Sequence, residues 1–311
     1  MFKSAKLLPL LDRLEERPAP RGAPERVLNA DDLIAFGRCP ARWLRSPDSD
    51  DPLLERGPSF TEWLAFRPEA ASAFFAERPE SYDALILRCP ACNSKGPGKL
   101  CRRCGLTRRH VVEPRPWSNA ATVCAEWTAQ HEAAGRRPIS ATTWRACADT
   151  VNDMALDPAI HELAELSDKL VHIRGVWHDD DTRLNFPVEA RITLLPAEGC
   201  RFDNAIVNYT ETRNGDPVAW RARLLTDALH LRAALALLLL NTRSETIRSD
   251  SFWIVVEKDP PRIVSRRSLG QDVLTSGRES LFALLGAYAR CLHTGGWPAF
   301  EDPAPCLAAR V

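Results

Sequence analysis

Four cysteines in the first half of the chain have the spacing of a metal site. Cys89 and Cys92 are separated by two residues, as are Cys101 and Cys104, and eight residues lie between the two pairs. Each CxxC turn can present two thiolates to one ion, so two such turns complete a tetrahedral Cys₄ site. Two spaced pairs also favour a metal over a redox dithiol. We therefore predict a structural zinc in a small module over residues 88–110.

The same module is strongly basic. Between Arg88 and His110 the sequence contains seven lysines and arginines and no acidic residue. Four thiolates around Zn²⁺ do not cancel this positive charge, which would attract nucleic-acid phosphate. The alternative is a metal that only fastens a loop. The arginines expected to contact DNA here are Arg102, Arg103, Arg108 and Arg109.

A second set of polar residues lies on two predicted strands. Over residues 188–195 apolar and polar side chains alternate, with Thr193 on the polar face. After a turn at residues 196–199, Asn208 and Thr210 share one face of the next strand. Two such strands side by side would bring the two threonines and the asparagine to one place on a sheet.

The elements that position these residues form a mixed pattern. The chain has 311 residues, no net charge and 45% hydrophobic residues, which is enough for about two domains or for one domain with an insertion. The expected helices cover residues 29–44 with a break at Cys39-Pro40, 59–77 with an interruption at Pro68, 119–134, 140–155, 159–166, 219–240 and 273–292. The expected strands cover residues 171–178, 187–195, 204–210, 252–257 and 262–265. This order predicts an α/β or α+β domain with a central mixed sheet.

Several stretches together resemble the RecE-type (exodeoxyribonuclease VIII-like) branch of the PD-(D/E)XK nucleases of phage and prophage recombination systems. The resemblance spans about residues 29–302. It rests on the opening helix 29–44, the segment 57–64, the strand pair 171–196, the strand 205–217, the helix 227–241, and Glu257, Pro260, Pro261, Tyr288, Cys291, Trp297 and Pro298. It implies a restriction-endonuclease-like core, with a mixed sheet flanked by helices and the zinc module as an insertion.

The family hydrolyses phosphodiesters with Mg²⁺ held by two carboxylates, while a lysine two residues beyond the second carboxylate orients the attacking water. On this sequence the two aspartates fall on Thr193 and Asn208, and the lysine falls on Thr210. Neutral oxygens hold a hard cation weakly, and threonine cannot act as an ammonium group. The resemblance therefore implies an exonuclease-like protein that has lost its catalytic site.

The resulting hypothesis is a catalytically inactive, DNA-binding module associated with recombination. Arg221, Arg223 and Arg232 on the long helix would add to the DNA contacts of the zinc module. One alternative is a Mg²⁺-dependent DNA exonuclease with relocated residues, for which Glu189, Arg191 and Glu62 are the candidates. Another alternative is a protein–protein scaffold that does not touch DNA.

The expected domains are a flexible leader (1–28), a helical part of the nuclease-like domain (29–87), the zinc module (88–110), the nuclease-like core (111–302) and a tail (303–311). The N-terminus lacks the apolar core of a signal peptide, and no apolar segment approaches the roughly 20 residues that a membrane helix needs. We expect a cytoplasmic protein without membrane contact. A recombination protein and further copies of the chain are the partners that the resemblance implies.

Overall fold

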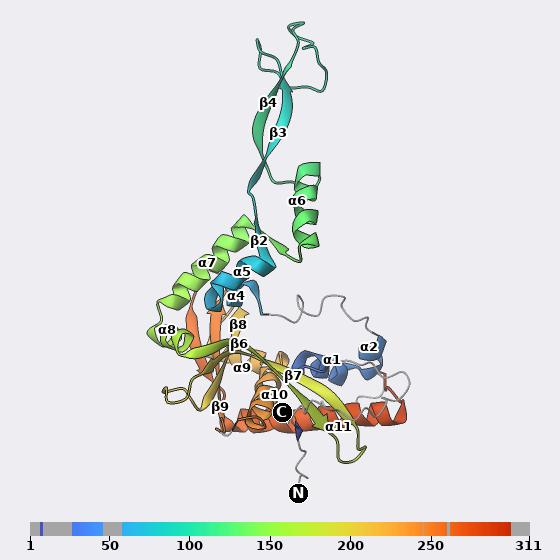
Figure 1. Cartoon of the computed structure of the whole chain (residues 1–311), viewed down its shortest axis with the longest axis vertical. Helices are drawn as coiled ribbons and strands as arrows, with labels where there is room; N and C mark the ends of the chain where they lie inside the picture. Colours follow the sequence, from blue (N-terminus) through green and yellow to red (C-terminus); the bar gives the residue numbers. More distant parts are fainter. Residues whose placement is uncertain (1–6, 9–26, 46–57, 245, 260–261, 300–311) are drawn as a thin grey trace. The chain divides into compact units, whose positions relative to one another are not determined.

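The computed structural model describes residues 7–8, 27–45, 58–244, 246–259 and 262–299, which form two compact units (Figure 1). The first unit combines residues 1–62 and 152–311, and the second unit comprises residues 63–151. The expected tail, and the expected leader apart from residues 7–8 and 27–28, lie outside the described residues.

The first unit is organised around a six-stranded sheet in the order β1-β6-β7-β8-β9-β10. Its strands are β1 (Leu7–Leu8), β6 (Ser167–His178), β7 (Asn185–Pro196), β8 (Ala205–Thr212), β9 (Asp250–Glu257) and β10 (Val264–Ser268). β8 and β9 pair parallel, whereas the other neighbours pair antiparallel. The sheet is therefore mixed, and the predicted α/β class is confirmed.

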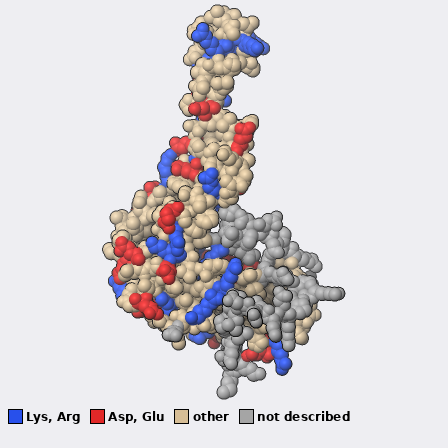
Figure 2. All heavy atoms as spheres, viewed as in Figure 1, with Lys and Arg blue, Asp and Glu red and all other residues tan. Residues whose placement is uncertain are grey.

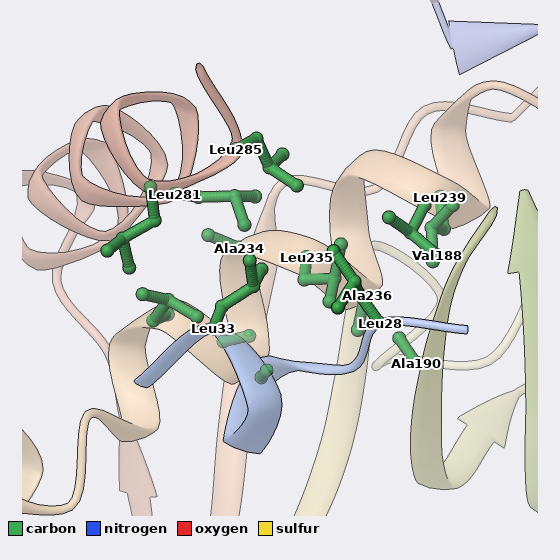
Figure 3. Close-up of a cluster of buried hydrophobic side chains, with 14 of the residues drawn as sticks. Leu28, Leu33, Val188, Ala190, Ala234, Leu235, Ala236, Leu239, Leu281 and Leu285 are labelled. Atoms are coloured by element: carbon green, nitrogen blue, oxygen red, sulfur yellow. The ribbon is translucent and has the colours of Figure 1, made fainter. Parts of the chain in front are cut away.

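The first unit also contains a set of helices, several of which form its main core together with the sheet. They are α1 (Ala30–Arg38), α2 (Pro40–Arg45), the start of α4 (Phe60–Phe66), α8 (Pro158–Glu165), α9 (Pro217–Thr226), α10 (Leu229–Asn241) and α11 (Gln271–Thr294). Ten of the thirteen residues of α10 are buried, as expected for a helix that is apolar on all sides. Figure 3 shows Leu235 and Leu239 of α10 near Leu28 and Val188 in this core, to which Leu281 and Leu285 of α11 also belong.

The predicted single helix over residues 219–240 is wrong, because α9 and α10 are two helices bent by 66°. Ala228, between them, has a left-handed backbone with φ 48°. His230 Nδ1 donates a hydrogen bond to the Leu224 carbonyl oxygen, 3.2 Å away. This bond satisfies one of the carbonyl groups in the last turn of α9, which have no partner within the helix. No single helix in the described parts of the chain is long and apolar enough to cross a membrane; α9 and α10 meet the length and composition criteria only as this bent pair.

α10 and α11 approach each other closely at a glycine. A Cβ atom added to Gly277 would lie 2.5 Å from the carbonyl oxygen of His230. This contact is with backbone, which cannot move aside as a flexible side chain can. The two helices can therefore pack at this distance only because position 277 has no side chain.

The second unit carries a long hairpin. Its elements are α5 (Pro68–Phe74), β2 (Phe75–Arg78), β3 (Ser81–Arg88), β4 (Arg109–Pro116), α6 (Thr122–Ala133), β5 (Arg137–Ser140) and most of α7 (Ala141–Ala155). β3 and β4 pair antiparallel along their whole length, from Ser81↔Pro116 to Arg88↔Arg109, while β2 and β5 form a separate parallel pair. None of the strands of this unit was predicted from the sequence. The hairpin holds the predicted zinc module at its far end (Figure 1).

Candidate functional site

The four cysteines with metal-site spacing meet at the end of the β3–β4 hairpin. Their Sγ atoms all lie within 4.8 Å of one another, and those of Cys92 and Cys101 are 3.6 Å apart. Four sulfurs at about 2.3 Å from a tetrahedral zinc ion would be roughly 3.8 Å apart. The donor set and its spacing are thus compatible with a metal ion such as zinc.

The two CxxC turns are built in the same way. The carbonyl of Cys89 accepts a hydrogen bond from Asn93 N at 2.9 Å, and that of Cys101 accepts one from Gly105 N at 2.8 Å. Asn93 and Gly105 both have a left-handed backbone, with φ of 55° and 69°. Asparagine and glycine tolerate this conformation better than other residues. Each turn therefore ends in the residue type that its geometry favours.

The protonation of the thiols also fits a cation. Ser94 Oγ lies 3.2 Å from Cys92 Sγ and 3.3 Å from Cys101 Sγ. The hydrogen bond with Ser94 is the main reason why the pKa of Cys101 is lowered to about 5, whereas the hydrogen bond with Cys92 raises the pKa of Cys104 to about 12. The four sulfurs thus cannot all ionise by themselves near neutral pH. A coordinated metal would remove this conflict, because a coordinating thiol is deprotonated.

Basic side chains gather around the cysteine cluster, and Figure 2 shows lysine and arginine over the end of the hairpin. Arg102, Arg103 and Arg109 are exposed. Arg108 instead donates from Nη1 to the Gly98 carbonyl at 2.9 Å, and its guanidinium lies where a side chain of Gly96 would be. Of the four arginines predicted to contact DNA in this module, three are therefore open to a ligand, while Arg108 shapes the loop.

An acidic residue outside the predicted module neutralises part of its charge. Glu113 on β4 forms ion pairs with Arg88 and with Lys95, the latter at 2.7 Å. These two partners, first Arg88 and then Lys95, lower the pKa of Glu113 to about 2. Glu113 was not considered in the sequence analysis, because it lies outside residues 88–110. Only the pairing of β3 with β4, in which Glu113 is opposite Ala84, brings it close to the cysteine loops.

In the first unit, a pocket of about 320 Å³ collects most of the predicted catalytic positions. It is lined by Asn29, Ala30, Asp31, Pro58, Glu62, Leu170, Glu189, Ala190, Arg191, Ile192, Thr193, Asn208, Tyr209, Arg232 and Trp253. Thr210 lines a neighbouring pocket of about 270 Å³, which shares Asp31 and Arg232 with the first. The structure thus brings Thr193 and Asn208 to one pocket and places Thr210 beside it.

Thr193 connects three elements through its hydroxyl group. It donates to Glu62 Oε1 at 2.9 Å and accepts from the backbone nitrogen of Tyr209 at 3.0 Å. The ladder between β7 and β8 pairs only Leu194 with Val207, so the hydroxyl continues the connection where the two backbones separate. Thr193 is 6% exposed. Its role is to join β7, β8 and α4 through the hydrogen bonds of its hydroxyl group.

Glu62 is occupied by two local contacts. Its Oε2 accepts from the backbone nitrogen of Ser59 at 2.9 Å, and the Ser59 hydroxyl accepts from Glu62 N at 3.2 Å, which forms a capping box at the start of α4. Its other oxygen accepts from Thr193. Burial, and to a smaller extent the nearby charge of Glu211, raise the pKa of Glu62 above 4.5.

This raised pKa predicts a pH effect on stability. Because the folded protein binds the Glu62 proton more tightly than the unfolded chain does, stability falls as the pH rises from 4.5 through the folded-state pKa. Glu62→Gln keeps a capping side chain without a charge. We expect it to raise Tm at neutral pH and to leave Tm nearly unchanged below pH 4.5. Thermal melts across this range test it, with Glu69→Gln on the exposed part of α5 as the control. An equal gain at every pH would contradict the expectation.

The other carboxylates of the pocket are also engaged. Glu189 Oε2 lies 3.0 Å from His172 Nε2 and 3.2 Å from Arg174 Nε, and Asp31 Oδ1 lies 2.6 Å from Arg232 Nη2. Among the described residues, the cysteine cluster is the only group of three or more Cys, His, Asp or Glu side chains close enough to hold one ion. The residues of this pocket therefore do not fit a carboxylate-bound Mg²⁺.

The three arginines predicted to add DNA contacts lie on two helices. Arg221 is exposed on α9. Arg223 Nε bonds to Asp227 Oδ2 at 2.6 Å and its guanidinium also donates to the Glu211 carbonyl, which fastens α9 to β8. Arg232 on α10 is bound to Asp31 of α1. Two of the three thus hold elements of the unit together.

Comparison with known proteins gives only distant similarities. No family model matches the chain, and no curated protein matches it. Among solved structures, the chain is similar to a putative exonuclease from Eubacterium rectale, with 9% identity and a TM-score of 0.37, over 60% of this chain and 69% of that one. It is also similar to SSO0001, with 8% identity and a TM-score of 0.27, over 51% of this chain and 69% of that one. The chemistry of the site therefore has to be inferred from the residues of this chain.

Proposed function

We propose that this protein binds nucleic acid through the metal-binding module at the end of the β3–β4 hairpin. The observation that carries the proposal is the set of three exposed arginines, Arg102, Arg103 and Arg109, around the Cys₄ cluster. Guanidinium groups bind phosphate oxygens well, and a metal-fastened loop would hold them in fixed positions. Such contacts recognise the nucleic-acid backbone and not its sequence.

The second part of the proposal is that the PD-(D/E)XK-like core does not cleave nucleic acid. Its support is the resemblance, which puts the metal-binding aspartates at Thr193 and Asn208, together with the contacts of the pocket. Thr193 is used to join strands, and the remaining carboxylates are paired or hydrogen-bonded. The protein would then act as a DNA-binding module in a recombination process.

Binding is tested with duplex DNA at several salt concentrations. We expect the wild type to bind at low salt with a steep salt dependence, because phosphate contacts release counterions. The double variant Arg102→Ala/Arg103→Ala should bind more weakly, and the slope of log K against log salt should fall by about two. Both arginines lie between Cys101 and Cys104, so the zinc content of the double variant is measured as well. It must equal the zinc content of the wild type for the loss of binding to be assigned to the arginines.

The control is the double variant Arg243→Ala/Arg278→Ala, which removes two exposed arginines of the first unit. It should leave both the affinity and the salt slope unchanged. A wild-type protein that does not bind DNA even at low salt would overturn the proposal and favour the scaffold alternative.

Cleavage is tested separately, by incubating linear duplex DNA with the protein and Mg²⁺. We expect the DNA to remain intact. Degradation that depends on Mg²⁺ and is lost in Glu189→Ala would instead support an exonuclease with relocated carboxylates. This outcome would leave the proposed role of the zinc module standing, because the two parts rest on different units of the chain.

A further inference from the structure

Two buried hydrogen-bond donors beside the pocket have no partner. Asn208 is 7% exposed and Trp253 is 2% exposed. Neither Asn208 Nδ2 nor Trp253 Nε1 makes a hydrogen bond with any of the described residues. A buried donor without an acceptor destabilises the folded chain, so a pair of them in one place points to a ligand or to water that satisfies both.

The two donors belong to one place in the fold. Asn208 on β8 and Trp253 on β9 are direct partners in the parallel register, so their side chains lie on the same face of the sheet. Both residues line the pocket of about 320 Å³, which is within the range of small-ligand sites. The two residues that carry the unpartnered donors therefore line the same cavity.

The polarity of these groups selects the kind of ligand. An indole nitrogen can only donate a hydrogen bond, so Trp253 cannot act as an oxygen ligand for a hard cation. The carboxylates of the lining are already bound: Asp31 to Arg232, Glu62 to Thr193 and Ser59, and Glu189 to His172 and Arg174. Two guanidinium groups, those of Arg191 and Arg232, are also in the lining. The ligand that suits this set is an acceptor with negative charge.

We propose that this pocket binds an oxyanion of the phosphate class through Asn208 Nδ2 and Trp253 Nε1, in the place where the resemblance expects a divalent cation. This inference goes beyond the proposed function, because it rests on the donors of the first unit and not on the cysteine module. The phosphate group can come from free phosphate or from a phosphodiester of nucleic acid. The same two donors would serve either source.

The test follows the indole N–H resonance of Trp253 in a ¹H–¹⁵N spectrum of the full chain. Trp253→Phe identifies this resonance, because it removes the N–H and keeps a ring. We expect inorganic phosphate at millimolar concentration to shift the resonance. If only a short oligonucleotide without a terminal phosphate shifts it, the inference also stands and the ligand is a phosphodiester. The absence of any shift with either probe, up to tens of millimolar, would overturn it.

Two variants test the assignment of the donors. Asn208→Asp replaces the amide donor with a carboxylate, whose negative charge repels phosphate. Phosphate should therefore bind at least about tenfold more weakly. Asn152→Asp, on the exposed surface of α7, adds the same charge outside the pocket and should leave the affinity unchanged. Trp177→Phe removes another buried indole whose N–H has no partner among the described residues, outside the pocket lining, and should also leave binding unchanged. Equal weakening in these controls would contradict the site.

A separate measurement tests whether a cation binds in this pocket. Mn²⁺ is paramagnetic and broadens the resonances of nearby protons, so it reports binding without any enzymatic activity. We expect the Trp253 resonance to remain sharp when Mn²⁺ is added. Selective broadening of this resonance would mean that a cation occupies the pocket, and it would overturn the inference.

Discussion

Cys101→Ser is expected to reduce the zinc content of the purified protein from about one ion per chain to nearly none. It removes one of four sulfurs that lie within 4.8 Å of one another, and a structural zinc in a small module contributes about 10–16 kcal/mol of apparent binding free energy. Residues 88–110 should then become sensitive to limited proteolysis, because the loops between β3 and β4 have little buried apolar surface of their own. Metal analysis and peptide mapping check both effects.

The matched control is Cys200→Ser, which changes a cysteine outside the cluster. This variant should retain its zinc and its resistance to proteolysis. The first unit of Cys101→Ser should also melt as in the wild type, because its core does not include the hairpin. A wild-type chain that contains clearly less than one zinc, when purified without chelator, would refute the metal site.

Gly277→Ala is expected to destabilise the first unit by about 1–3 kcal/mol, as overpacking of a tight core does. The added methyl group would be 2.5 Å from the carbonyl oxygen of His230, so α10 and α11 would have to separate. Both helices belong to the main core, and their separation would loosen its packing. Denaturant unfolding of the two proteins measures the difference.

Gly286→Ala is the control on the same helix. An added Cβ there would lie 3.4 Å from Arg290 Nη1, the end of a flexible side chain, and 4.0 Å from Asp179 Oδ1. Because alanine favours a helix over glycine by about 1 kcal/mol, this variant should be neutral or more stable than the wild type. The same loss of stability in both variants would show that the close approach at Gly277 is not the cause.

Much of the first unit could be predicted from local pattern. Strand β7 was expected over residues 187–195 and covers Asn185–Pro196, because its apolar positions alternate regularly. The division between α1 and α2 lies directly before Pro40, and the proline that marks it is visible in the sequence. The break at Ala228 could not be predicted, because alanine is the best helix former.

The β3–β4 hairpin was missed for a different reason. An isolated two-stranded ribbon has no fully buried face, so its side chains need not alternate between apolar and polar residues. Leu85 and Val112, which are paired across it, are 67% and 58% exposed. Pro114 and Pro116 also argue locally against a strand. The pattern that reveals the central sheet is therefore absent here.

The grouping of Thr193 and Asn208 could be predicted from the sequence, but the contacts of these residues could not. A period of two placed Thr193 and Asn208 on neighbouring strands, and the structure brings both to one pocket. The hydrogen bond from Thr193 to Glu62 joins residues 131 positions apart, which no local pattern can reveal. The capping box of Ser59 and Glu62 was readable in the sequence, yet Glu62 was considered only as a substitute catalytic residue.

The hydrogen bonds of Thr193 also affect how this chain could evolve. An aspartate at position 193 would put a second carboxylate beside Glu62, and it would lose the hydroxyl proton that Thr193 now donates. Such a change would destabilise the junction of β7, β8 and α4 before a second carboxylate or a metal could compensate. A cation-binding site at this place would therefore require several simultaneous substitutions. The contacts of Thr193 that stabilise the fold would in this way oppose the appearance of a metal site at this position.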